Sequence, residues 1–136
     1  MGKATDAPQR VLIVEDDALL ALSIKDILTE SGTPDIATCS SAKEALAELK
    51  RNDQDVLILD VHLADSDDGW AIAELVQGLG TKAPRIVFST ASPEDIPNNI
   101  SRLGTVLEKP YAPDDLIAAT RIKPKGLLPR IIRSRR

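Results

Sequence analysis

Carboxylates stand at the ends of two apolar runs in the sequence. Glu15 and Asp16 follow residues 11–14, and Asp60 ends the run 55–60. Three carboxylates brought together cannot all stay ionised without a cation, because like charges within about 4 to 6 Å disfavour ionisation. Oxygen ligands with no grouped histidine or cysteine favour Mg²⁺ or Mn²⁺ over zinc. We therefore predict that Glu15, Asp16 and Asp60 form a site for Mg²⁺ (or Mn²⁺).

Asp60 is the candidate nucleophile of this cluster. A carboxylate held against a divalent metal can attack an incoming phosphoryl group and become an aspartyl phosphate. Lys109 follows another apolar run and supplies the fixed cation that such a transfer needs beside the equatorial oxygens. Thr90, also at the end of an apolar run, offers a hydroxyl to one of those oxygens, and Pro110 permits a cis peptide that would aim Lys109. The predicted chemistry is acceptance of a phosphoryl group by Asp60.

The elements that must position these residues alternate between strands and helices. Each continuous apolar run is typical of a strand buried on both faces, and a helical pattern follows each one. Pro93 and Pro97 leave room for about two helical turns at most before Gly104, which predicts a short or irregular fourth helix. The predicted strands cover residues 11–14, 35–38, 55–60, 85–89 and 105–108.

Five such alternations predict an α/β fold with a doubly wound, five-stranded parallel sheet of order 2-1-3-4-5, of the flavodoxin-like type. Ligands of these sheets bind outside the carboxyl ends of the strands at the switch point, here between the first and third strands. That rule brings the three carboxylates together. Two helix starts are also predicted, with Asp17 as one N-cap and Ser41 with Glu44 as a capping box.

Charge divides the 136 residues unevenly. The net charge is −4, yet residues 121–136 hold seven basic and no acidic side chains, so the preceding 120 residues carry a net −11. An acidic body argues against DNA binding by the main domain. We expect a flexible lead-in at 1–9, one domain at 10–123 and a basic tail at 124–136.

The sequence also bears on the compartment of the protein. Cys39 is the sole cysteine, so the chain forms no internal disulfide, as is usual in the cytoplasm. The N-terminus has no apolar signal core, and no apolar run approaches the roughly 20 residues that span a bilayer. We expect a cytoplasmic protein that does not associate with membranes.

The sequence resembles a receiver domain of the two-component response regulators over about residues 10–122. Each matching motif is short, and their order at successive strand ends makes the set specific. Phe88 and Thr90 also match the subgroup named for the motif Phe-Ala-Thr-Gly-Tyr. The motifs of the family match are Val11-Leu12-Ile13-Val14-Glu15-Asp16-Asp17, Asp60, Thr90-Ala91 and Lys109-Pro110.

The resemblance implies a role for each acidic residue of the cluster. Asp60 would be the phosphoacceptor. Asp16 and Asp60 would hold the metal directly, and Glu15 would help mainly through water. His62 would contribute its backbone carbonyl to the metal.

The resemblance further implies that Lys109 and Thr90 contact the phosphoryl oxygens. One difference from the family pattern concerns how phosphorylation would be signalled to the rest of the domain. The aromatic switch residue of the family is expected three positions before the lysine, where this chain has Val106. A signal passed through the segment 92–104, as in the Phe-Ala-Thr-Gly-Tyr subgroup, is then expected instead.

We interpret the chain as a stand-alone response regulator. It would accept a phosphoryl group on Asp60 from a histidine kinase or histidine phosphotransfer protein. It would then signal through protein contact or act as a phosphate shuttle or sink. It would catalyse its own phosphorylation and dephosphorylation without being a conventional enzyme, and its tail is too short for a DNA-binding domain.

Two alternatives remain at this stage. A phosphorylation-independent protein-binding module would have the same fold. An aspartate-nucleophile phosphohydrolase would use Asp60 and Lys109, but His62 stands where that class has its second aspartate, and no substrate cap domain is present.

Overall fold

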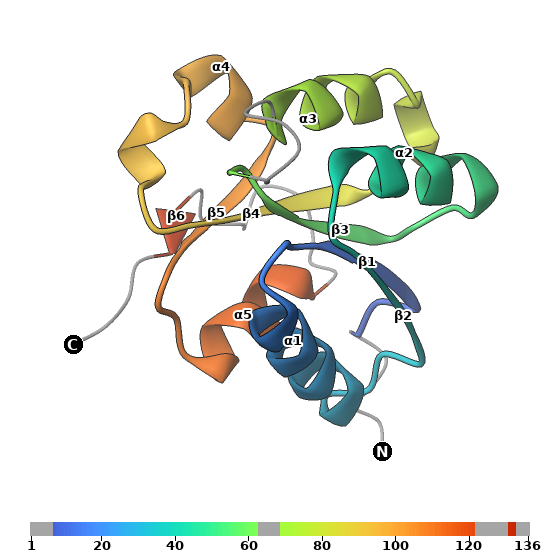
Figure 1. Ribbon diagram of the computed structural model, residues 1–136, viewed down its shortest axis with the longest axis vertical. Coiled ribbons are helices and arrows are strands. Elements are labelled where there is room, and N and C mark those ends of the chain that lie inside the picture. Colours follow the sequence, from blue (N-terminus) through green and yellow to red (C-terminus); the bar gives the residue numbers. More distant parts are fainter. Residues whose placement is uncertain (1–6, 63–68, 122–130, 133–136) are drawn as a thin grey trace.

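A computed structural model describes residues 7–62, 69–121 and 131–132 of the chain. One parallel sheet lies between two helical layers (Figure 1). None of the described helices combines the length and apolarity needed to cross a membrane. The strands are β1 (Arg10–Val14), β2 (Asp35–Cys39), β3 (Val56–Asp60), β4 (Arg85–Thr90), β5 (Gly104–Glu108) and β6 (Ile131–Ile132). The helices are α1 (Ala18–Glu30), α2 (Ala42–Arg51), α3 (Gly69–Gln77), α4 (Asn98–Ser101) and α5 (Pro113–Thr120), with 3-10 turns η2 (Gly80–Lys82) and η3 (Pro93–Asp95).

The strand order is β2-β1-β3-β4-β5-β6, and every neighbouring pair is parallel. The predicted order 2-1-3-4-5 of the first five strands is therefore confirmed. The sequence did not predict β6, in which Ile131 and Ile132 pair with Val106 and Leu107. An edge strand presents unpaired backbone groups, so even two apolar residues of the tail can extend the sheet there. The other residues of the predicted lead-in and tail lie largely outside the described ones, and those boundaries stay predictions.

Side chains alternate between the two faces of the sheet and form two separate cores. α1 and α5 cover one face, while α2, α3 and α4 cover the other (Figure 1). On the α1/α5 face, the buried strand residues are Val11, Ile13, Val56, Ile58, Val87 and Leu107. On the opposite face, they are Leu12, Val14, Leu57, Leu59, Ile86, Phe88 and Val106. Residues in register on parallel strands point to the same face, so this alternation also fixes the direction of the side chains at the strand ends.

Side chains cap the helices that begin near the carboxyl ends of β1 and β2. Asp17 accepts hydrogen bonds from Leu19 N and Leu20 N at the start of α1, as predicted. Ser41 accepts one from Glu44 N at the start of α2. The predicted capping box is shifted, because the Glu44 carboxylate accepts from the amide of Ser40, one residue before the N-cap, at 2.9 Å.

The connection between β4 and β5 contains little regular structure. It consists of η3 and the four-residue α4, which confirms the short fourth helix. Gly104 then starts β5 in close contact with β4. A Cβ atom at this position would lie 2.2 Å from the carbonyl oxygen of Ile86. Only glycine allows β4 and β5 to approach so closely here.

Candidate functional site

Three acidic residues meet at the carboxyl ends of β1 and β3. These strands are neighbours, and Val14 pairs with Leu59, so Glu15 and Asp60 extend adjacent strand ends. Ligand oxygens of Glu15, Asp16 and Asp60 lie within 4.8 Å of one another. Glu15 and Asp60 are buried, whereas Asp16 is exposed. An all-oxygen, acidic donor set of this size suits a hard divalent cation such as Mg²⁺.

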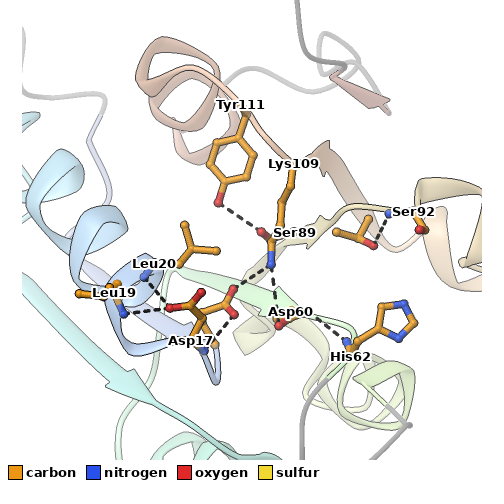
Figure 2. A network of polar contacts seen from close by, with 11 residues as sticks. Asp17, Leu19, Leu20, Asp60, His62, Ser89, Ser92, Lys109 and Tyr111 are labelled. Atoms are coloured by element: carbon orange, nitrogen blue, oxygen red, sulfur yellow. Dashed lines mark hydrogen bonds and ion pairs between the residues drawn. The ribbon is translucent and has the colours of Figure 1, made fainter.

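Lys109 reaches this cluster from the end of β5. Its Nζ lies 3.2 Å from Glu15 Oε1 and 3.9 Å from Asp60 Oδ2 (Figure 2). Its backbone N–H donates to Thr90 O at 2.8 Å, which attaches the start of the loop to β4. The Lys109-Pro110 peptide is cis, as the sequence suggested. The ammonium therefore faces the carboxylates of both Glu15 and Asp60.

The surroundings of Glu15 change the pKa of its side chain. Burial, together with the adjacent Asp60 carboxylate, raises the pKa of Glu15 to about 7. The Lys109 ammonium and the hydrogen bond from Asp17 N offset part of this rise in pKa. A bound cation favours the ionised carboxylate, because a metal ligand must be deprotonated. Glu15 contacts Lys109 directly here, a contact that the resemblance did not imply.

The two oxygens of Asp60 have different surroundings. Oδ1 accepts a hydrogen bond from His62 N at 3.1 Å, and Oδ2 faces Lys109. His62 thus contacts Asp60 through its backbone, and its side chain is exposed. The predicted role of the His62 carbonyl as a metal ligand stays a prediction.

Thr90 is buried at the end of β4, but its hydroxyl has another partner. Thr90 Oγ1 accepts a hydrogen bond from Ser92 N at 3.0 Å. By the alternation along β4, Thr90 shares the face of Phe88, opposite to the face of Ser89. Because Thr90 Oγ1 is the acceptor in this contact, the hydroxyl keeps its own proton available for donation to a second group.

One polar contact beside the cluster was not predicted from the sequence. Ser89 Oγ and Tyr111 Oη lie 3.2 Å apart, beside the Lys109 side chain (Figure 2). Ser89 pairs in register with Asp60 across β3 and β4. A serine in an otherwise apolar strand, one residue before Thr90, was the available signal for a polar partner.

A cavity of about 300 Å³ adjoins the acidic cluster between α1, β2 and α2. Glu15, Asp16, Lys25, Cys39 and Glu44 are among the residues that line it. Burial raises the pKa of the Cys39 thiol to about 11, so it stays protonated at neutral pH. The cavity therefore adjoins the Glu15 and Asp16 side of the acidic cluster.

A doubly wound sheet with acidic residues and a lysine at its carboxyl edge is the arrangement of a receiver-type α/β domain. The family model for the response regulator receiver domain matches residues 11–121. The chain therefore belongs to the response regulator receiver family, whose members act in two-component signal transduction.

Individual relatives agree with this assignment. The chain is 26% identical over 112 residues to the chemotaxis protein CheY of Bacillus subtilis, covering 81% of this chain and 92% of that protein. It is 31% identical over 124 residues to the transcriptional regulatory protein PdtaR of Mycobacterium tuberculosis, covering 87% of this chain but only 60% of PdtaR. A two-component response regulator from Clostridium difficile superposes with a TM-score of 0.71 at 26% identity, covering 81% of this chain and 90% of that one.

Proposed function

We propose that this chain is a stand-alone response regulator that accepts a phosphoryl group on Asp60. The observation that carries the proposal is the position of Lys109, whose ammonium lies beside both Glu15 and Asp60. The Asp16 carboxylate belongs to the same cluster at this edge of the sheet. A cation fixed next to a carboxylate nucleophile stabilises the charge that develops on a transferring phosphoryl group. The donor would be a histidine kinase or a histidine phosphotransfer protein.

Asp60 performs the covalent step in this mechanism. One of its oxygens attacks phosphorus, the new O–P bond forms, and the N–P bond to the donor imidazole breaks with its electron pair going to that nitrogen. Lys109 stays within reach of the Oδ2 side, and the His62 amide holds Oδ1. Asp16 and Asp60 would hold Mg²⁺ directly, with Glu15 helping through water and His62 contributing its backbone carbonyl, and the ion would supply charge neutralisation during the transfer.

Thr90 and the segment after it would report the phosphorylated state. The Thr90 hydroxyl would leave Ser92 N and donate to a phosphoryl oxygen, which releases one hydrogen bond at the start of η3. The segment 92–103 would then rearrange and change the affinity for a protein partner, or the domain would act as a phosphate shuttle or sink. The likeness of residues 88–92 to the Phe-Ala-Thr-Gly-Tyr subgroup and the short α4 support this route. We place the protein in the cytoplasm and assign its main domain no DNA-binding role.

A loading experiment tests this function. Wild-type protein incubated with acetyl phosphate and Mg²⁺ should gain one phosphoryl group by intact mass spectrometry, and omission of Mg²⁺ should prevent it. Asp60→Asn should not load. The matched control is Asp53→Asn, which changes an exposed carboxylate before the start of β3, at the strand end opposite to Asp60, and should load like wild type. Equal loading of Asp60→Asn would show that another residue is the acceptor.

Protein contact provides the second half of the test. A partner that binds the phosphorylated wild type more tightly than Asp60→Asn supports signalling by phosphorylation. A partner that binds both proteins equally, with or without acetyl phosphate, would instead identify a phosphorylation-independent binding module.

A further inference from the structure

Ser89 and Tyr111 connect two elements through their side chains. Ser89 lies in β4 and is 0% exposed, and Tyr111 lies in the loop between β5 and α5. Their hydroxyl oxygens are 3.2 Å apart, within hydrogen-bonding distance (Figure 2). Burial raises the pKa of the Tyr111 hydroxyl, so it stays protonated and able to donate at neutral pH.

This contact is placed where it can restrain Lys109. Tyr111 is two residues after Lys109, and the intervening Pro110 has no N–H with which to pair. The backbone of Lys109 is attached to β4 through Thr90 O at 2.8 Å. The Tyr111 hydroxyl supplies a second attachment to the same strand, at the residue before Thr90. Two attachments on either side of Pro110 limit the rotation of the loop that carries the ammonium.

The contact also lies on the same face of the sheet as the acidic cluster. Ser89 pairs in register with Asp60 on one side and with Leu107 on the other. Leu107 belongs to the core on the α1/α5 face, and the Tyr111 ring packs against that core. Residues in register share a face, so the Ser89 hydroxyl and the Asp60 carboxylate point into the same layer. The Tyr111 pKa is raised in part by the charges of Glu15 and Asp60, which agrees with this proximity.

We propose that Ser89 and Tyr111 are positioning residues for phosphoryl transfer, and that their hydroxyl contact holds the Lys109 ammonium at the acidic cluster. The proposal rests on the function proposed above and identifies what orients its cation. Packing of the ring is not sufficient for this role. A phenylalanine at 111 would fill the same space, but it would leave the buried Ser89 hydroxyl without this partner.

The test compares phosphorylation rates with acetyl phosphate and Mg²⁺ in three variants. Tyr111→Phe and Ser89→Ala each remove one hydroxyl, and each should slow loading of Asp60 by roughly three- to tenfold, the effect of losing one neutral hydrogen bond. The double variant should be no slower than the slower single variant, because both changes break the same contact. Ser31→Ala, which removes a hydroxyl at the C-terminal end of α1, is the matched control and should load at the wild-type rate.

A second experiment, in the Lys109→Gln variant, distinguishes positioning of Lys109 from a purely structural role of Tyr111. Starting from Lys109→Gln, Tyr111→Phe should cause no further loss of rate, since the group it positions is already absent. Thermal melting should show that Tyr111→Phe remains folded. Wild-type loading by Tyr111→Phe, or an undiminished effect of Tyr111→Phe in the Lys109→Gln background, would overturn the proposal.

A measurement without phosphate separates this proposal from the proposed function. In lysine ¹⁵N NMR of the unphosphorylated protein, the Lys109 Nζ signal should be protected from exchange in wild type and should weaken in Tyr111→Phe. If wild type fails to load phosphate, the proposed function is wrong, and this NMR comparison alone decides whether Tyr111 positions Lys109. An unchanged Lys109 signal in Tyr111→Phe would count against positioning.

Discussion

The region around the acidic cluster and the connection between β4 and β5 differ in the length and capping of their helices. Beside the cluster, α1 has 13 residues, and Asp17 caps it with two hydrogen bonds. In the β4–β5 connection, α4 has four residues, and neither η3 nor α4 has a side-chain hydrogen bond at its N-cap. Helix termini without such partners are easier to open. The cluster therefore lies beside a long, capped helix, whereas the β4–β5 connection contains only short helical turns without side-chain caps.

The faces of the sheet reinforce this contrast. By alternation, the buried Glu15, Asp60 and Ser89 side chains belong to the α1/α5 face, while Thr90 and Val106 belong to the other. The groups proposed to react and the segment proposed to report their state thus contact separate cores. This separation allows the β4–β5 connection to rearrange while the distances within the cluster are kept. Three predictions test it, from the largest expected effect to the smallest.

Replacement of Lys109 should have the largest effect. Lys109→Gln keeps a polar side chain but removes the charge beside Asp60, and loading from acetyl phosphate should slow by about 100-fold. The comparison is a rate measured by mass spectrometry against Ser101→Ala in the β4–β5 connection, which should behave as wild type. Near-normal loading of Lys109→Gln would show that the cluster does not depend on this cation.

The stability of the cluster should depend on pH through Glu15. In metal-free protein, the folded state keeps the proton on Glu15 between pH 4.5 and about 7, whereas the unfolded chain loses it. The free energy of unfolding should therefore fall as pH rises through this range, by roughly 2 to 3 kcal/mol. Urea unfolding at several pH values measures it, and added Mg²⁺ should restore stability at the upper end.

The control for this prediction is a pair of isosteric variants. Glu15→Gln should abolish this part of the pH dependence. Glu74→Gln, at an exposed position of α3, should leave it intact. Equal slopes for Glu15→Gln and wild type would mean that the proton is held elsewhere.

The smallest effect concerns the N-caps of the two regions, whose loss changes the free energy of unfolding. Asp17→Ala removes two cap hydrogen bonds and should lower the free energy of unfolding by about 1 kcal/mol. Ser92→Ala, at the N-cap of η3, removes a side chain that makes no cap bond and should change stability by less than about 0.5 kcal/mol. Urea denaturation compares them, and similar losses would mean that both regions rely on their caps.

Much of the fold could be predicted because its signals are local. Continuous apolar runs identified β1 and β3, and the N-caps Asp17 and Ser41 stand where their residue types predict. β6 was missed because two isoleucines have no periodicity of their own, and their strand depends on the edge of β5. The shifted Glu44 contact was missed because it depends on the path of the chain before the helix.

The cluster was predictable in its composition but not in its contacts. The rule for ligand sites in parallel sheets brings Glu15, Asp16 and Asp60 together from strand order alone. Which partner a side chain chooses depends on distances that the pattern does not contain. The Ser92 contact of Thr90 and the pairing of Ser89 with Tyr111 became visible only in three dimensions.

The acidic cluster and Lys109 depend on a glycine, Gly104, that lies far from them at the other end of β5. It begins the strand whose far end leads to Lys109, about 17 Å away at 3.3 Å per residue. A methyl group there would collide with the carbonyl oxygen of Ile86 and force β5 away from β4. Because a strand moves largely as a unit, the ammonium would move with it. Engineering of the proposed phosphoryl site therefore has to keep glycine at position 104, even though this residue is remote from Lys109.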